Sequence, residues 1–287
     1  MEYHNKLPPE GINTTRVNPL KQFMQLAIAA LVLVVIVVVF LQFTGAFLAK
    51  RIPFTYETAV VERLDSPFGD AAEHPEMIAY LNDLASRLSD NMPMPDDMAV
   101  TVHYDAEDVF NAFATVGGNL LFYKGLLAKI PDENTLAMVM AHEISHVLHR
   151  DPIAAMGGGI ASTLALLGLT GNAGTGMAGS VLNKAGLLTG VQFTRKMEVA
   201  ADHQALNAMQ ASYGHVGGAA ELFAIFQGQR GTSSSSQPVW LERFMSTHPL
   251  DQDRIDQIEQ LAGSEGWSLQ GPMTPLPEDF KARLLKP

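Results

Sequence analysis

The stretch AHEISHVLHR, from Ala141 to Arg150, is the part of the sequence on which the predicted fold and function depend. It contains His142, Glu143 and His146 in the pattern H-E-x-x-H. Residues four positions apart on a helix lie about 40° apart around its axis, so both imidazoles can face one metal ion. Imidazoles suit zinc, and a catalytic zinc has three protein ligands and a fourth position for water. The adjacent carboxylate can accept a proton from that water.

The residues around this pattern favour a buried helix. Asp132 follows Pro131 and is a good N-cap, because its carboxylate can accept a hydrogen bond from an unpaired backbone amide. Apolar residues then recur at helical spacing, namely Leu136, Val139, Met140, Ile144 and Val147. Buried ionisable groups are costly unless they are paired or bind a metal. The alternative is a core helix whose histidines have ordinary hydrogen-bond partners.

Composition limits the possible functions. The 287 residues suffice for one domain of about 200 residues with appendages. The formal charge is −11 and no basic cluster stands out, so nucleic-acid binding is not expected. There is no cysteine, which excludes disulfides and thiolate zinc sites. Any zinc ligands must therefore be histidines and carboxylates.

The N-terminal region consists of a polar tail and a long apolar segment. Residues 1–21 form the tail, and residues 22–49 contain no charged residue. The run from Leu26 to Leu41 is apolar without a break and, with its flanks, can span a bilayer as a helix of about 20 residues. We therefore expect a transmembrane anchor in contact with membrane lipid. A cleaved signal peptide is the alternative, which the long stretch before the apolar run disfavours.

The orientation of this anchor is not decided by charge. Basic residues are equally frequent on both sides of the span, so the positive-inside rule gives no preference. We expect a single-pass protein of the bacterial inner membrane, with the tail in the cytoplasm and the main domain on the extracytoplasmic side.

Between the anchor and the zinc helix, the sequence predicts one helix and a small sheet. Residues 75–90 place apolar side chains on one helical face, and residues 98–104 alternate as in a strand. Two further extended segments, Asn111–Ala114 and Leu120–Tyr123, flank the turn at Gly117-Gly118. We therefore expect a mainly α, α+β domain with a small antiparallel sheet.

One edge of this sheet is a candidate substrate-binding strand. An exposed strand beside a metal site can accept an extended peptide through main-chain hydrogen bonds, which allows varied sequences to be held. The candidate residues are Asn111, Ala112, Phe113 and Ala114. A plain core hairpin explains the same residues equally well.

The region after the zinc helix is rich in glycine and has no charged residue between Asp151 and Lys184. Residues 153–169 could form a second membrane helix, because small residues favour close helix packing in lipid. We prefer a partly apolar helical hairpin over residues 153–183 that covers the active site or touches the membrane surface. Such an excursion beside the catalytic helix could also act as a lid.

A third zinc ligand is expected from a second helix. Residues 193–210 have an apolar stripe at helical spacing, and Glu198 and Asp202 lie four residues apart at its edge. Like charges at this spacing repel, whereas a nearby cation makes the arrangement favourable. Glu198 is therefore predicted to bind the ion, and Asp202 to accept a hydrogen bond from the far nitrogen of a ligating histidine. Alternatively, both acids lie on a solvated edge, balanced by Arg195 and Lys196.

Together these motifs resemble a known family. H-E-I-S-H at 142–146, followed by T-R-K-M-E-V-A-A-D at 194–202, is similar to the membrane-associated zinc metallopeptidases that include HtpX and the CaaX prenyl protease. That family pairs HExxH with a downstream ExxxD. The resemblance includes the edge segment and Thr247-His248-Pro249 with Arg254, and it covers residues 54–262. The resemblance implies a zincin-like metallopeptidase domain there, followed by a loosely ordered tail over residues 263–287.

The resemblance also implies roles for single residues. His142, His146 and Glu198 would hold one Zn²⁺, and Glu143 would be the general base. His248 is similar to a family histidine that steadies the oxyanion or occupies the open coordination position. Its neighbours Thr247 and Pro249 could equally serve only to start the next helix.

The chain departs from the family in two respects. Arg150-Asp151 stands where the family often has Arg-His, and only one membrane span is evident. His149 lies one turn beyond the motif, so we expect it to contact a ligand or to be structural and not to bind the metal itself.

The resulting prediction is a membrane-anchored zinc endopeptidase that cleaves unfolded or membrane-associated proteins or peptides in membrane or envelope protein quality control. A membrane-tethered zinc-binding module, chaperone-like or an adaptor without proteolysis, is the alternative. A zinc hydrolase acting on non-peptide bonds is a third possibility.

Overall fold

The computed structural model describes residues 18–62, 74–170, 193–219, 221, 248 and 252–285. Most of the predicted polar tail, residues 171–192 of the glycine-rich region, and Thr247 and Pro249 lie outside the described residues. The described elements are, in chain order, α1 (Pro19–Ala49), α2 (Phe54–Val61), α3 (Pro75–Ser89), β1 (Thr101–Asp105), β2 (Ala112–Thr115), η1 (Val116–Gly118), β3 (Asn119–Tyr123), α4 (Lys124–Leu127), α5 (Glu133–Leu148), α6 (Asp151–Thr170), α9 (Arg195–Tyr213), α12 (Gln252–Glu265) and α13 (Phe280–Arg283).

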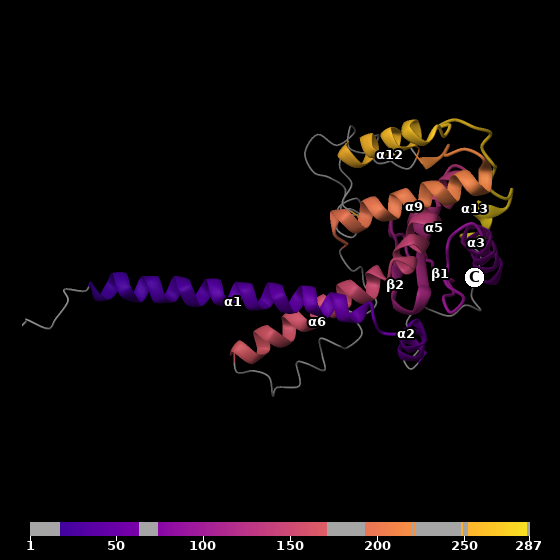
Figure 1. Cartoon of the computed structure of the whole chain (residues 1–287). Coiled ribbons are helices and arrows are strands. Elements are labelled where there is room, and N and C mark those ends of the chain that lie inside the picture. Colours follow the sequence, from indigo (N-terminus) through magenta and orange to yellow (C-terminus); the bar gives the residue numbers. More distant parts are fainter. Residues whose placement is uncertain are drawn as a thin grey trace, which may run out of the picture.

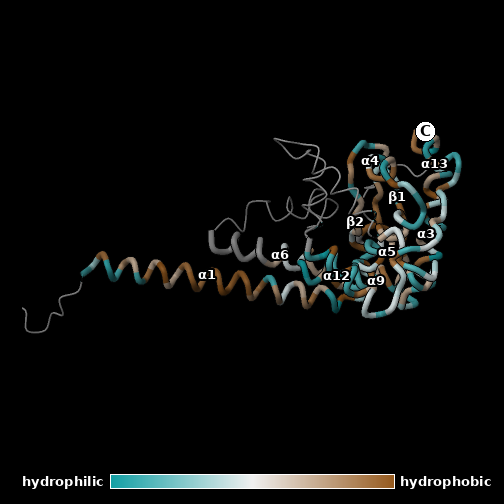
Figure 2. Tube along the Cα trace, turned by 90° about the horizontal axis from the view of Figure 1, so that it is seen from above, coloured by the Kyte–Doolittle hydropathy of each residue, from teal (hydrophilic) through white to brown (hydrophobic). Residues whose placement is uncertain are grey.

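The apolar N-terminal segment forms one long helix, α1, that extends away from the sheet and from α5 and α9 (Figure 1). The side chain of Asn18 caps its start by accepting hydrogen bonds from the amides of Leu20 and Lys21. Its apolar side chains are mostly exposed, and the colouring in Figure 2 shows hydrophobic residues along most of its length. Among the described residues it is the one helix long and apolar enough to cross a membrane. Exposing these apolar side chains to water costs free energy, so the helix would be more stable within a lipid bilayer.

The sheet has three strands in the order β1-β3-β2, and it is mixed. β3 runs antiparallel to β2 but parallel to β1, so the prediction of a wholly antiparallel sheet was wrong. β2 and β3 form a tight hairpin in which Gly117 and Gly118 have φ values of 73° and 75°, a region that favours glycine. The longer connection from β1 to β2 instead carries the chain across the sheet. β1 therefore lies on the far edge and runs in the direction of β3.

α5 is the centre of the domain and contacts α3, α9 and β2. Every residue from Glu133 to Val147 is buried. Asp132 caps this helix, as predicted, by accepting a hydrogen bond from the amide of Thr135 at 2.8 Å. The predicted apolar face of α3 is also confirmed, because Leu81, Leu84, Ala85 and Leu88 are buried in the same core.

α6 runs back along α1, and the two helices lie side by side (Figure 1). Their backbones approach closely, since a Cβ added at Gly157 would lie 2.6 Å from the Cβ of Ala49. The described half of the glycine-rich region is thus a single helix packed mainly on α1. The second half of the predicted hairpin lies outside the described residues.

The C-terminal region has little regular structure before α13, but it is attached to the core. Phe280 of α13 is buried in the main cluster. Lys281 donates hydrogen bonds to the carbonyls of Leu127, Ala128 and Ile130, just before the start of α5.

Candidate metal centre

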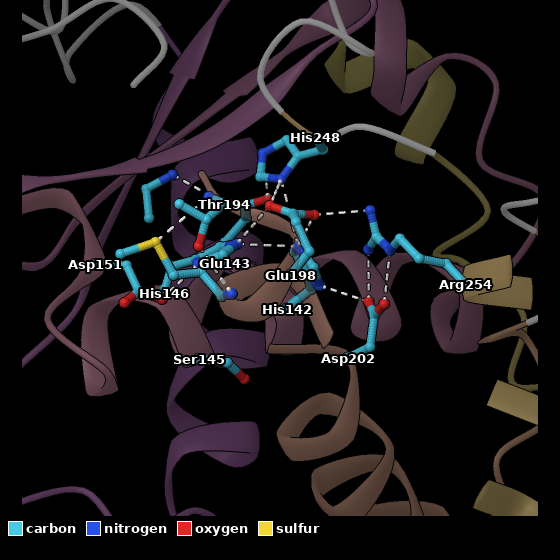
Figure 3. Close-up of polar contacts among 12 residues, drawn as sticks. His142, Glu143, Ser145, His146, Asp151, Thr194, Glu198, Asp202, His248 and Arg254 are labelled. Carbon is cyan, nitrogen blue, oxygen red and sulfur yellow. Dashed lines mark hydrogen bonds and ion pairs between the residues drawn. The ribbon is translucent and has the colours of Figure 1, made fainter. Parts of the chain in front are cut away.

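α5 and α9 pack against each other, and their polar residues meet at one buried point. His142 and His146 come from α5, Glu198 comes from α9, and His248 comes from the chain between α9 and α12. Figure 3 shows these side chains pointing toward one another. One potential ligand atom from each of the four lies within 4.8 Å of the others.

The distances among the three predicted ligands suit a tetrahedral ion. The Nε2 atoms of His142 and His146 are 3.1 Å apart. The Glu198 oxygens lie 3.5 Å from His142 Nε2 and 3.4 Å from His146 Nε2. Ligand atoms placed 2.0–2.1 Å from a tetrahedral zinc lie about 3.3 Å from one another. The side chains therefore have both the donor types and the spacing that Zn²⁺ requires.

The remaining nitrogen of each α5 histidine contacts a carboxylate. His142 Nδ1 lies 2.9 Å from Asp202 Oδ1, the type of contact predicted for Asp202. His146 Nδ1 lies 3.0 Å from Asp151 Oδ2. A histidine that donates from Nδ1 keeps its Nε2 lone pair for a metal, so these carboxylates favour the metal-binding tautomer.

The role of Asp151 was not predicted from the sequence. The residue lies just beyond the end of α5, where Arg150 adopts a φ of 59° and the chain turns into α6. The sequence feature that could have drawn attention to Asp151 is its position at the border of a long region without charged residues. The ring of Phe193 also stacks on His146, with centroids 3.9 Å apart, and restricts the imidazole further.

Arg254 of α12 supplies a positive charge next to the carboxylates of Glu198 and Asp202. Its Nη1 lies 2.7 Å from Glu198 Oε2, while Nε and Nη2 bind the two oxygens of Asp202. All three side chains are buried. The sequence marked Arg254 only through the family resemblance, because its partners lie on another helix.

These contacts shift the ionisation of the site. Burial lowers the pKa of His142, but its hydrogen bonds with Asp202 and Glu198 outweigh burial and raise that pKa to about 10. Burial raises the pKa of Glu198, yet the surrounding histidines, His248 foremost, hold it well below its usual range. The pKa of His146 is raised against burial by Asp151 and Glu198. Protons and a metal ion therefore compete for the same imidazole nitrogens.

Glu143 lies next to this donor group and is 1% exposed. Its Oε2 accepts a hydrogen bond from the amide of Ala114 at 2.8 Å. Its Oε1 lies 3.4 Å from Nε2 of His248. The carboxylate thus connects α5 to β2 and is held at one oxygen while the other faces the histidine cluster.

The predicted substrate edge lies on the outer strand of the sheet. β2 pairs only with β3 among the described strands, and the Ala114 amide points away from β3 toward Glu143. The main-chain groups of Ala112 point to the same side, because alternate residues of a strand share their direction. All residues from Asn111 to Thr115 are buried in this structure. His149, which was not expected to bind the metal, is the C-cap of α5 and is half-buried.

Comparison with known proteins identifies the family. The model of peptidase family M48 matches residues 75–262, a span that contains His142, Glu143, His146, Glu198 and His248. This chain belongs to peptidase family M48. The predicted membership of the HtpX-like zinc metallopeptidases is thereby confirmed.

Curated M48 relatives include the beta-barrel assembly-enhancing protease of Escherichia coli K12, which is 31% identical over 205 residues, 63% of this chain and 38% of the relative. The protease of the same name from Yersinia pestis is 30% identical over 199 residues, 66% of this chain and 39% of the relative. The mitochondrial metalloendopeptidase OMA1 of Schizosaccharomyces pombe is 29% identical over 165 residues, 57% of this chain and 47% of the relative. The matched part thus spans less than half the length of these M48 proteins.

Proposed function

We propose that this chain is a membrane-anchored zinc endopeptidase. The observation that carries the proposal is the convergence of His142, His146 and Glu198 at tetrahedral spacing with Glu143 beside them. Membership of a peptidase family and the presence of one apolar helix suited to a membrane support it.

The three donors would hold the ion, and their partners Asp202 and Asp151 would fix the two imidazoles. When bound, Zn²⁺ would polarise the scissile carbonyl and lower the pKa of water at the site to about 7. The buried surroundings would strengthen this electrostatic effect, because charges interact more strongly in the low dielectric of a protein interior.

Glu143 would act as the general base and then as the general acid. It would take one proton from the attacking water and pass it to the nitrogen of the leaving amine as the peptide C–N bond breaks. The hydroxyl group of the water remains on the acyl carbon as part of the new carboxylate. The hydrogen bond from Ala114 supports this role, because it orients the carboxylate without neutralising it.

The substrate would add to the outer edge of β2 as an extended strand. Within the segment Asn111, Ala112, Phe113 and Ala114, the main-chain groups that point away from β3 would hold it, namely the amide and carbonyl of Ala112 and the carbonyl of Ala114, beside the reacting groups. Because β2 and the donor group are both buried here, a peptide could reach them only if they became exposed. This structure therefore corresponds to a closed form of the proposed enzyme.

His248 would occupy the fourth coordination position in this closed form. Its Nδ1 lies 3.1 Å from Glu198 Oε1 and 3.4 Å from His142 Nε2, the same spacing as among the other donors. A water molecule needs that position for hydrolysis, so His248 would have to withdraw before catalysis.

The proposed substrates are unfolded or membrane-associated proteins or peptides, in membrane or envelope quality control. The names of the bacterial relatives, proteases that enhance beta-barrel assembly, support this substrate class. We place the protein in the bacterial inner membrane as a single-pass protein, with the catalytic domain on the extracytoplasmic side. The acidic net charge of −11 argues against a nucleic-acid partner.

One observation favours a second candidate function. A zinc with four protein ligands is typical of structural sites, and His248 supplies a fourth donor here. The chain could then be a membrane-tethered chaperone-like or adaptor module that binds zinc without proteolysis. This second function does not explain why Glu143 lies beside the donor group.

The Glu143→Gln variant separates the two functions. The full-length protein in detergent would be tested for bound zinc and for cleavage of an unfolded casein-like protein, with exposed Glu259→Gln as the matched control. We expect the variant to retain one zinc and to lose activity by about 10²–10⁴-fold, because a general base contributes that much. Cleavage at the wild-type rate would exclude the enzyme assignment. Absence of zinc from the wild type would exclude both functions.

A further inference from the structure

The membrane anchor ends directly on the zinc helix. Lys50 is the C-cap of α1. Its Nζ donates to the carbonyl of His149 at 2.6 Å and to Oδ1 of Asp151 at 2.9 Å. The Lys50 side chain is 38% exposed, whereas that of Asp151 is 2% exposed. A cation at the edge of the anchor therefore reaches a carboxylate inside the domain.

Asp151 uses its two oxygens in different directions. Oδ1 accepts from Lys50, and Oδ2 lies 3.0 Å from Nδ1 of His146. A carboxylate held on both sides is fixed in rotation and so fixes the plane of the imidazole. Partners of this kind orient a metal ligand and raise its basicity. Without Lys50, the buried Oδ1 would lose an ionic partner, and Asp151 would be freer to turn away from His146.

Close helix packing sets the register of this contact. A Cβ added at Gly45 would lie 2.6 Å from the carbonyl oxygen of Gly157, so α1 and α6 meet backbone to backbone. Asp151 is the first residue of α6. The position of α1 along α6 therefore determines whether Lys50 reaches its partner.

A second set of contacts connects the segment after α1 to the end of α5. Arg150, which has a φ of 59°, donates to the carbonyl of Ile52 at 2.7 Å and forms an ion pair with Glu57 of α2. Glu57 also accepts a hydrogen bond from the amide of Gly117 in the turn between β2 and β3. The segment that follows the anchor thus contacts both the end of the zinc helix and the hairpin that carries the proposed substrate edge.

We propose that Lys50 is a positioning residue for the metal ligand His146 and acts through Asp151. The anchor then supports the metal site as well as attaching the protein to the membrane. The inference rests on the proposed zinc site, and it adds to that site a chain of contacts from the membrane boundary.

The test uses the full-length protein in detergent micelles and the variants Lys50→Met, Lys50→Arg and Asp151→Ala. Arg51→Met is the matched control, because Arg51 is the next basic residue and packs over Phe47 away from the site. Zinc affinity is measured by competition with a chelator, and ligand geometry by the visible absorption of the Co²⁺-substituted protein.

We expect Asp151→Ala to weaken zinc binding about 10-fold or more, as is typical for outer partners of metal ligands, and Lys50→Met, one contact further from the metal, to weaken it less, by about threefold to tenfold. Lys50→Met should also change the Co²⁺ spectrum. Lys50→Arg should restore affinity and spectrum, because arginine keeps the charge and the hydrogen bond. Arg51→Met should resemble the wild type.

A double variant tests the route. If Lys50 acts through Asp151, then Lys50→Met should cause no further loss in the Asp151→Ala background. An equal loss in both backgrounds overturns the proposed route, and wild-type affinity and spectrum in Lys50→Met overturn the proposal itself. If Lys50→Met does not fold, Lys50→Gln takes its place, with the same weaker binding expected relative to Lys50→Arg. If the wild type binds zinc and cleaves, and the variants have the same zinc affinity and spectrum as the wild type, only this inference is contradicted. If the wild type binds no zinc, the proposed function is contradicted as well.

Discussion

Arg254 binds Asp202 through two hydrogen bonds, from Nε at 2.8 Å and from Nη2 at 2.7 Å. The same guanidinium lies 2.7 Å from Glu198 through Nη1. Asp202 in turn contacts Nδ1 of His142. One cation from α12 therefore compensates two buried acids of α9 and holds the carboxylate that orients a proposed ligand.

Replacing Arg254 by Met should destabilise the zinc-free protein by about 3 kcal/mol, because two buried carboxylates lose their compensating charge. Arg254→Lys should recover only part of this loss, since lysine cannot form the two-pronged contact. The free energy of unfolding in urea measures both changes.

The matched control for Arg254 is Arg195, which pairs with Asp253 across the same two helices at 2.6 Å, with both side chains exposed. Arg195→Met should change stability by less than about 1 kcal/mol, as is usual for surface ion pairs. A similar loss in both variants would mean that burial of the acids is not what makes Arg254 important.

Zinc affinity should increase with pH through the neutral range. The pKa of His142 is raised to about 10, so its ring carries an extra proton near pH 7 in the absence of metal, and the pKa of His146 is also raised above its ordinary value. Zinc must displace the proton of His142, and each displaced proton changes the apparent affinity about tenfold per pH unit. We therefore expect about 10-fold tighter binding at about pH 7.5 than at about pH 6.5.

Two measurements check this pH dependence. Chelator competition at both pH values gives the affinity, and an indicator dye in weak buffer counts the protons released per zinc. An affinity that does not change with pH, together with no proton release, would show that the imidazoles are already neutral before metal binds.

Removing His248 should not abolish cleavage. If its Nδ1 only occupies the fourth coordination position, His248→Ala should still bind one zinc through the other three donors and should cleave a casein-like protein at least as fast as the wild type. If His248 instead stabilises the oxyanion, kcat should fall by about 10²–10³-fold. Steady-state kinetics of the zinc-loaded variant, with Glu143→Gln as the inactive reference, distinguishes these roles.

The sequence predicted those features that depend on spacing within one element. The start of α5 at Asp132 follows from its N-cap and apolar pattern, and the structure confirms it. Glu198 and Asp202 could be placed on one helical face because they lie four residues apart, and the structure brings both next to the α5 histidines.

Features that depend on contacts between distant segments could not be predicted. The lysine at position 50 and Asp151 are 101 residues apart in the chain, and only the packing of α1 on α6 brings them together. The same limit applies to the sheet. Alternating apolar residues located β1, and the turn at Gly117-Gly118 located β2 and β3. The order β1-β3-β2, however, depends on the path of the connecting segments.

Glu133 should make a contribution to stability that is lost in acid. It lies at the start of α5 and accepts hydrogen bonds from Tyr80 of α3 at 2.9 Å and Tyr213 of α9 at 3.1 Å, and it forms an ion pair with Arg87 at 3.0 Å. Burial raises the pKa of Glu133, but Arg87 and Tyr80 outweigh burial and hold it below the ordinary value of 4.5. A carboxylate with a lowered folded pKa stabilises the protein above its unfolded pKa, and this contribution disappears as the pH falls through the folded pKa.

Glu133→Gln should therefore lower the free energy of unfolding by about 1–3 kcal/mol at about pH 7, because the buried charge-assisted hydrogen bonds are weakened. The difference between wild type and variant should shrink as the pH falls below the ordinary glutamate pKa of 4.5. Urea unfolding of the zinc-free proteins at several pH values measures it, with exposed Glu259→Gln as the control. A difference that stays constant down to strongly acidic pH would show that the Gln side chain disrupts packing, and that ionisation of Glu133 contributes nothing.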